Sequence, residues 1–131
     1  MIISGTVVDV VDNTGILKAR CIKVYGNTKK KYAKIGDIIL VVVETYTLKR
    51  GFFLDEKKKD RFLKGKKHKA LVLRTKQSYK RHYGVFIKFS DNAVILVNKR
   101  KLPLSKKLKG PILYEILEKH PAIGILARWL I

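Results

Sequence analysis

Six short apolar segments separated by turn residues constrain the fold of this chain more than any other feature. They are rich in Val, Ile, Leu or Phe and cover residues 5–11, 16–25, 37–44, 67–74, 84–89 and 93–98. Asp12-Asn13-Thr14-Gly15 and Ser90-Asp91-Asn92 supply turn chemistry between segments, because Asn and Gly tolerate positive φ and Asp or Asn caps its own backbone. Short strands at this spacing are typical of a small closed barrel without exposed sheet edges. We therefore expect a mainly β core.

The hydrophobic period changes after Gly110-Pro111. Ile112, Leu113, Ile116 and Leu117 fall on one helical face. Pro111 suits the first position of this helix, which we expect to end at Pro121, and a second short helix is expected within residues 123–131. The 131 residues thus predict one domain, with a barrel core at about 1–98 and a C-terminal loop and helices at about 99–131.

Excess positive charge is the second constraint. The chain holds 30 Lys and Arg against 10 Asp and Glu, a formal net charge of +20. Because 47% of the residues are hydrophobic, a folded core is expected, and the charge must then lie on its surface. So many uncompensated charges repel one another unless a polyanion neutralises them, which makes nucleic acid the leading partner.

The sequence gives little support for a disulfide, a catalytic site, a metal site or a nucleotide-binding loop. The single Cys21 excludes an intramolecular disulfide and a thiolate cluster, and is expected to be buried and inert. Asp9 and Asp12 are interpreted as solvated or turn-capping residues, and His68, His82 and His120, which lack metal-ligand spacing, as contacts for phosphate or solvent. No glycine-rich phosphate loop occurs. We therefore expect no enzyme, no cofactor and no metal.

Membrane insertion and targeting also lack a signal in the sequence. The aliphatic run at residues 38–43 is far shorter than the roughly 20 residues that span a bilayer, so no membrane partner is expected. The start of the chain as given has neither the apolar region of a signal peptide nor an Arg-rich presequence.

Basic residues are combined with aromatic residues in three regions, 29–32, 49–69 and 76–83. Lys and Arg can meet phosphates, while Tyr can stack on an unpaired base or bond a ribose hydroxyl. This pattern leaves a free-standing single-stranded RNA-binding barrel as the alternative function. Such a module should stack bases on aromatic residues of its barrel face, whereas most aromatic residues here lie in loops.

Seven motifs follow one another in order along the chain. They are Val11-Asp12-Asn13-Thr14-Gly15, Cys21-Ile22-Lys23-Val24-Tyr25-Gly26, Tyr32-Ala33-Lys34-Ile35-Gly36-Asp37-Ile38-Ile39, Lys64-Gly65, Lys69-Ala70-Leu71-Val72-Leu73-Arg74-Thr75-Lys76, Phe89-Ser90-Asp91-Asn92-Ala93 and Gly110-Pro111. In order and spacing they resemble the universal large-subunit ribosomal protein family numbered fourteen, from about residue 7 to about residue 127.

The resemblance implies a five-stranded β-barrel with a projecting β-ribbon, here roughly from Arg74 to Phe89, and a short C-terminal helical region. It also implies a structural constituent of the large ribosomal subunit that binds large-subunit rRNA and reaches small-subunit rRNA across an intersubunit bridge. Neighbouring large-subunit ribosomal proteins, and a ribosome silencing or anti-association factor, are the further partners implied.

The expected rRNA-binding residues combine the basic runs with the family motifs. They are Asn13, Lys23, Lys29, Lys30, Lys31, Tyr32, Lys64, Lys66, Lys67, Arg74, Lys76, Lys80, Arg81, Lys99, Arg100, Lys106, Lys107 and Lys109. Within the ribbon, Lys76, Lys80 and Arg81 are expected to face RNA and not to support the fold.

Two departures from the family pattern stand out. Residues 46–63 form a longer segment than usual, which we expect to become ordered only within the ribosome; a longer hairpin packed on its own barrel is the alternative. Residues 104–109 keep the charge of the family's stretch before Gly-Pro but replace Arg by Lys. A Lys-, Ile- and Tyr-rich member without a presequence fits a mitochondrial, organelle-encoded protein, with the bacterial cytoplasm as the alternative.

Overall fold

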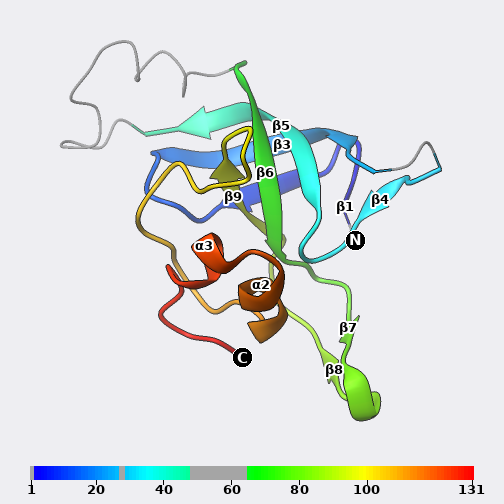
Figure 1. Cartoon of the computed structure of the whole chain (residues 1–131). Coiled ribbons are helices and arrows are strands. Elements are labelled where there is room, and N and C mark those ends of the chain that lie inside the picture. The colour runs from blue at the N-terminus through cyan, green and yellow to red at the C-terminus, as the bar shows by residue number, and fades with distance from the viewer. Residues whose placement is uncertain (1, 27–28, 48–64) are drawn as a thin grey trace.

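A computed structural model describes residues 2–26, 29–47 and 65–131. Its centre is a closed barrel of five strands in the order β2-β3-β5-β6-β9 (Figure 1). Their bounds are β2 (Val7–Val10), β3 (Ile16–Val24), β5 (Ile38–Tyr46), β6 (Lys67–Arg74) and β9 (Ala93–Val97). Neighbouring strands are antiparallel except β2 and β9, whose parallel pairing closes the barrel. The predicted mainly β, five-stranded barrel is confirmed.

Strand alternation divides the apolar side chains of the barrel between two cores. Ala70 and Val72 of β6 belong to the inner core with Val94 and Leu96 of β9. The intervening residues, Leu71 and Leu73 of β6 with Ile95 and Val97 of β9, pack outward in a second core under the C-terminal segment. All five residues of β9 are therefore buried, because this strand is covered on both faces.

Irregular pairing bends the long strands around this small core. Strands β3 and β5 change register between Ile16 and Lys18, between Lys18 and Ala19, and again between Cys21 and Lys23. Extra residues of this kind increase local twist and curvature, which allows few strands to close into a barrel.

The turn between β2 and β3 has the geometry that its sequence predicts. Gly15 has a φ of +91°, and Asp12 caps the turn by accepting hydrogen bonds from the Thr14 backbone N–H (3.1 Å) and hydroxyl (2.5 Å). The second oxygen of Asp12 accepts the Leu96 N–H at 3.1 Å. Asp12 was expected to be either solvated or a cap of the turn. It is a cap and is buried, because it also connects the turn to β9.

Two smaller pairs of strands flank the barrel. β1 (Ile2–Ile3) pairs with β4 (Tyr32–Ala33), while β7 (Tyr79–Lys80) and β8 (Phe86–Ile87) form a ribbon around the 3-10 turn η1 (His82–Gly84). The ribbon projects from the barrel beside the C-terminal helices (Figure 1), as the family resemblance implied. The apolar pattern alone predicted β8 but not β1, β4 or β7.

The C-terminal helices are α2 (Tyr114–Lys119) and α3 (Pro121–Gly124), and both differ from the predicted bounds. Pro111 is not the first residue of a helix, because Leu113 is extended and the Ile112 N–H donates to the carbonyl of Trp129 at 3.1 Å. The Ile131 N–H donates back to Ile112 at 2.9 Å, so residues 129–131 cannot continue a helix. Pro121 ends α2 and begins α3, since a helix tolerates proline in its first turn.

Candidate nucleic-acid interface

Most acidic side chains in the described ranges already have partners within the chain. The ion pairs are Arg20–Glu44 at 2.5 Å, Lys30–Asp37 at 2.9 Å, Lys119–Asp37 at 4.0 Å, Arg74–Asp91 at 3.0 Å and Arg81–Glu115 at 2.7 Å. Asp12 is buried and accepts three hydrogen bonds from N–H and O–H groups. These carboxylates therefore do not neutralise the remaining cations.

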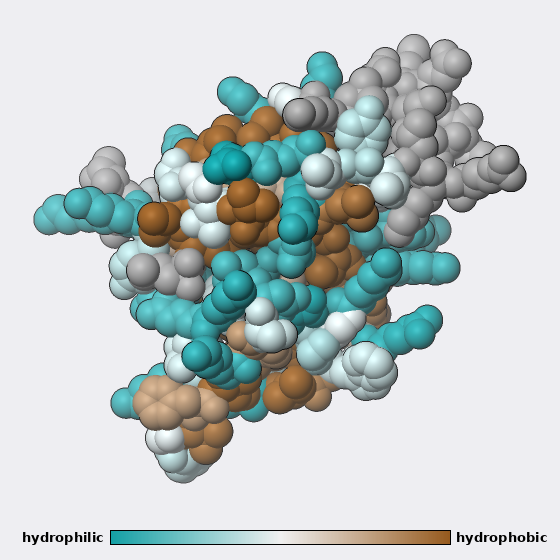
Figure 2. Space-filling view, turned by 180° about the vertical axis from the view of Figure 1, so that it is seen from behind, coloured by the Kyte–Doolittle hydropathy of each residue, from teal (hydrophilic) through white to brown (hydrophobic). Residues whose placement is uncertain are grey.

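Many exposed cations form no salt bridge within the part of the chain that the structure describes. They are Lys18, Lys23, Lys31, Lys34, Lys66, Lys67, Lys76, Lys80, Lys88, Lys99, Arg100, Lys101, Lys106, Lys107, Lys109 and Arg128. On the face seen in Figure 2, hydrophilic side chains project around much of the outline. The molecule thus presents positive charge in several directions.

One group of cations lies on the outer face of the barrel, across β3, β5 and β6. Arg20, Val42 and Lys67 are paired in one row, and Lys23, Leu40 and Lys69 in the next. Each row places a basic residue on either side of a central aliphatic residue, because cross-strand partners share a face of the sheet.

An aromatic ring lies beside the second of these rows. The Nζ atoms of Lys23 and Lys69 lie 5.3 and 5.1 Å from the centre of the Tyr25 ring. These distances are within the range of cation–π contacts, which hold both amines near the ring.

A second group surrounds Asp37. A pocket of about 380 Å³ is lined by Lys30, Lys69, Lys99, Lys101 and Lys119, and a neighbouring one of about 650 Å³ by residues that include Lys29, Lys31, Tyr32 and Lys34. Asp37 lines both pockets, and its Oδ2 also accepts the Lys34 N–H at 2.8 Å. Asp37 is thus a carboxylate shared by two pockets whose other charged lining residues are basic, and it binds Lys30, Lys34 and Lys119 around it.

His120 also lines the smaller pocket but is directed to the protein backbone. Its Nε2–H donates to the carbonyl of Gly36 at 3.3 Å, and burial lowers the pKa of the imidazole. At neutral pH the ring is therefore uncharged. The expectation that the three histidines contact phosphate or solvent stays a prediction, but in this residue one ring nitrogen already binds a backbone carbonyl.

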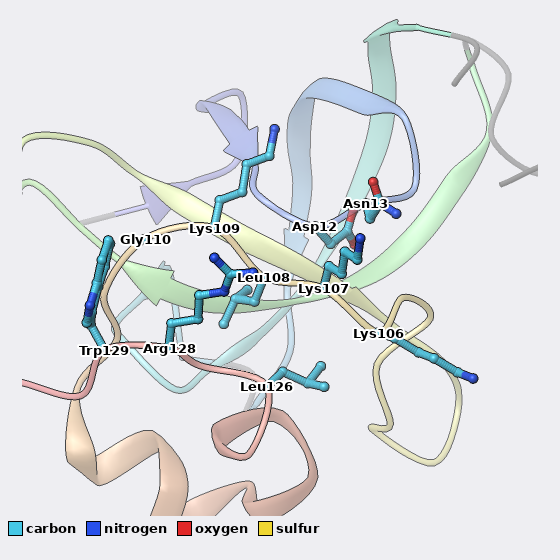
Figure 3. A pocket seen from close by; sticks show the side chains of 10 residues that line it. All are labelled: Asp12, Asn13, Lys106, Lys107, Leu108, Lys109, Gly110, Leu126, Arg128 and Trp129. Atoms are coloured by element: carbon cyan, nitrogen blue, oxygen red, sulfur yellow. The ribbon is translucent and has the colours of Figure 1, made fainter. Parts of the chain in front are cut away.

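A third group lines a pocket of about 470 Å³ between the β2–β3 turn and the C-terminal segment (Figure 3). The lining consists of Asp12, Asn13, Lys106, Lys107, Leu108, Lys109, Gly110, Leu126, Arg128 and Trp129. Backbone groups join its two walls: the Asn13 N–H donates to Ser105 Oγ at 3.1 Å, and the Lys109 N–H to the Val11 carbonyl at 2.9 Å. The basic residues of 106–109 are thus held beside the turn.

The groups needed for catalysis are not assembled in the described ranges. Cys21 is fully buried, as predicted, and burial raises the pKa of its thiol. Groups of His, Cys, Asp or Glu that could hold a metal ion do not occur among the described residues, and no helix there is long and apolar enough to cross a membrane. What the surface offers is cations, amides and aromatic rings.

Comparison with known families agrees with this arrangement. The sequence model of the family Ribosomal protein L14p/L23e matches residues 1–131. The chain belongs to this family. It is therefore a structural constituent of the large ribosomal subunit and not an enzyme, and its place is the ribosome. The alternative of a free-standing RNA-binding module loses its basis.

Arg74 does not lie at the surface of this ribosomal protein. The side chain is 7% exposed, and its Nε and Nη2 each donate to one oxygen of Asp91 at 3.0 Å. Its Nη1 donates to the carbonyls of Lys109 (3.1 Å) and Pro111 (3.0 Å). With its donors engaged in this way, Arg74 joins β6 to the C-terminal segment. The prediction that it contacts RNA is therefore withdrawn.

Arg81 also supports the fold, contrary to expectation. Its Nε lies 2.7 Å from Oε1 of Glu115 in an ion pair, and its Nη2 donates to Oε2 at 3.0 Å and to the Ile131 carbonyl. These interactions fasten the ribbon to α2. Ala at this position would therefore loosen the ribbon as well as remove a charge.

The remaining predicted residues fall into the groups described above. Lys23 and Lys67 lie on the outer sheet face, Lys29, Lys30, Lys31, Tyr32 and Lys99 around Asp37, Asn13, Lys106, Lys107 and Lys109 at the third pocket, and Lys76 and Lys80 on the ribbon. Lys66 and Arg100 are exposed outside these groups. Lys64 and nearly all of the 46–63 segment lie outside the described residues.

Several members of these groups were not predicted from the sequence. Lys69 and Tyr25 belong to the outer sheet face, and Arg128 and Trp129 to the third pocket. For the last two a signal was present, since a cation next to an aromatic residue was the pattern used elsewhere in the chain. Lys119 needed the fold, because only tertiary packing brings α2 close to Asp37.

Proposed function

We propose that the chain binds large-subunit rRNA through its exposed cations and contributes to an intersubunit bridge with small-subunit rRNA. The observation that carries this proposal is the distribution of charge: most of the described carboxylates have partners inside the fold, whereas a large set of surface cations has no carboxylate partner among the described residues. Such a surface attracts phosphates and gains affinity by releasing their counterions.

The chemistry of the three basic groups suits the RNA backbone better than base edges. Most of the free cations are Lys, which acts as a mobile point charge, whereas three of the Arg side chains are used in salt bridges within the fold. Lysine–phosphate pairs fix position on RNA without reading its sequence. The outer sheet face, the surroundings of Asp37 and the third pocket would each hold a different part of the rRNA.

Sedimentation of the native protein tests this function. In a gradient of a cell or organelle extract, nearly all of it should travel with large subunits and whole ribosomes, and a high-salt wash should release it. A protein that sediments mainly free, with or without RNA, would contradict the proposal. Protection of rRNA from chemical probing in the same fractions would then identify the helices that it touches.

The ribbon is the part best placed to reach beyond the large subunit. Lys76, Lys80 and Lys88 are exposed along it, and its end carries the exposed apolar residues Tyr83, Val85 and Phe86. Apolar residues also gather at the lower left of Figure 2, where the rotated view places the ribbon. We propose that the lysines serve the bridge and that the apolar end packs on a neighbouring ribosomal protein.

Subunit association separates the bridge from general rRNA binding. Large subunits carrying Lys76→Ala, Lys80→Ala and Lys88→Ala should assemble but join small subunits less readily. Subunits with Lys23→Ala, Lys67→Ala and Lys69→Ala provide the control, because these residues lie on the barrel. Equal association in both cases would remove the ribbon from the bridge. We assign no residues to docking of a silencing or anti-association factor.

The compartment is proposed from composition alone. A Lys-, Ile- and Tyr-rich member of the family fits a mitochondrial ribosome, and the bacterial cytoplasm is the alternative. Detection of the protein in ribosomes of purified mitochondria would support the first, and its presence in bacterial ribosomes the second.

A further inference from the structure

The third pocket contains an aromatic side chain that the fold does not use. Trp129 is 65% exposed, although large aromatic residues are usually well covered. Its backbone is nevertheless fixed, because its carbonyl accepts the Ile112 N–H at 3.1 Å and Leu130 forms a parallel bridge with Ile112. The indole is therefore presented to solvent on a rigid support.

The pocket that this indole lines also contains cations. Lys107, Lys109 and Arg128 line the same pocket and form no salt bridge within the described ranges. In Figure 3 the guanidinium of Arg128 extends into the space between Trp129 and Asn13, whereas Lys106 is directed away. The Asp12 carboxylate in the lining accepts its hydrogen bonds from Thr14 and Leu96 and forms no salt bridge with these cations within the described ranges.

An uncommitted amide lies at the other end of the pocket. The backbone N–H of Asn13 is bound to Ser105, but its side-chain amide makes no hydrogen bond with the described residues. The amide is partly exposed and offers both a donor and an acceptor. Together with a volume of about 470 Å³, within the range of small-ligand sites, this gives a pocket with an aromatic face, positive charge and one polar anchor.

We propose that this pocket binds a single unstacked nucleotide of ribosomal RNA, an inference that rests on the proposed rRNA binding. The base stacks on Trp129, its phosphates meet Lys107, Lys109 and Arg128, and Asn13 bonds the ribose or a base edge. Stacking on an aromatic ring accepts any base, because every base has a π face. A paired nucleotide cannot use the indole, so the pocket selects a bulge or a loop.

The intrinsic fluorescence of the chain reports this site directly, since Trp129 is its only tryptophan. The full chain is titrated with an RNA hairpin that carries one bulged nucleotide and with the same hairpin fully paired. Binding is followed in parallel by anisotropy of labelled RNA. We expect both hairpins to bind, but only the bulged one to quench the tryptophan. Equal quenching by both, or binding of the bulged hairpin without quenching, would overturn the inference.

Variants then separate stacking from charge. Trp129→Leu should weaken binding of the bulged hairpin by about fivefold to a hundredfold without changing the salt dependence, while Trp129→Phe should keep most of the affinity. Ile125→Ala, which removes another exposed apolar side chain of the same segment outside the pocket, is the matched control and should have no effect. Thermal unfolding of each variant shows that the fold is kept.

The outcomes distinguish this inference from the function on which it rests. If the full chain fails to bind large-subunit rRNA, the proposed function fails. If it binds rRNA with strong salt dependence but Trp129→Leu binds the bulged hairpin as tightly as the parent, only the inference fails. Quenching by a purified large-subunit protein and not by the bulged hairpin would overturn it in favour of a protein partner.

Discussion

Arg74 joins Asp91 to the backbone of Lys109 and Pro111, and we call this contact the Arg74 seam. The seam and the third pocket, which contains Trp129, use the same kinds of residue in opposite ways. In the seam, one guanidinium and one carboxylate are matched donor to acceptor, and the arginine also binds two backbone carbonyls. The pocket adjoins the seam through Lys109 and Gly110, yet its cations have no such partners among the described residues. Both regions contain positively charged side chains. Whether a cation has a carboxylate or carbonyl partner inside the fold therefore distinguishes residues that stabilise the fold from residues that are available to bind RNA.

The largest effect should come from breaking the seam. Arg74→Ala removes the partner of Asp91 and leaves the carbonyls of Lys109 and Pro111 without their donor, so we expect a loss of about 3 kcal/mol in the free energy of unfolding. Urea denaturation measures it. Arg74→Lys should recover only part of this loss, because an ammonium cannot reproduce the paired hydrogen bonds to Asp91. A loss below about 0.5 kcal/mol, typical of surface sites, would show that the seam is not structural.

A smaller loss is expected where the backbone passes the guanidinium. Gly110 has a φ of +84°, and a Cβ at this position would collide with Nη1 of Arg74. Gly110→Ala should therefore cost about 2 kcal/mol of stability. Ala at Gly84, which also has positive φ but no other atom of the described residues within 4 Å of an added Cβ, is the control for the backbone conformation alone. Equal losses of stability at both positions would mean that the Arg74 side chain moves aside at little cost when a Cβ is added at Gly110.

A pH-dependent effect should be smaller still. Burial raises the pKa of Asp12 above its usual value of 3.8, although hydrogen bonds from Thr14 and Leu96 oppose the shift. Between the unfolded and the higher folded pKa, the native state binds more protons, so protonation of this group adds stability as pH falls and removes it as pH rises. Asp12→Asn cannot titrate. The stability of the parent relative to this variant should therefore increase as pH is lowered toward 4, and a constant difference would contradict the shift.

The strands of the barrel were predictable because apolar, largely β-branched runs bounded by turn residues coincide with 7–10, 16–24, 38–46, 67–74 and 93–97. The helix boundaries were not, since the hydrophobic period continues through Ile112 and Leu113. What stops the helix is a bridge to residues 129–131, far along the chain. Tertiary pairing of this kind leaves no local signal.

Candidate site residues were predictable as a class but not one by one. Basic runs indicated an RNA-binding surface, yet Arg74 and Lys80 look alike in sequence, and only packing makes one a buried tie and the other an exposed charge. The same limit applies to Lys30, which pairs with Asp37, and to Lys69, which lies beside Tyr25. Whether a basic residue forms a salt bridge depends on which carboxylate the fold brings close to it.

The salt dependence of rRNA binding tests the central claim most directly. Lys23→Ala, Lys67→Ala and Lys69→Ala together should reduce the slope of log affinity against log salt by roughly 0.7 to 0.9 for each phosphate that the variant no longer neutralises, while stability changes by less than about 1 kcal/mol. Arg74→Gln, which removes a charge that is already paired with Asp91, should leave the slope unchanged at temperatures where the variant remains folded. If the triple variant keeps the parent slope, or if Arg74→Gln lowers it, then salt bridges within the fold do not decide which cations bind RNA.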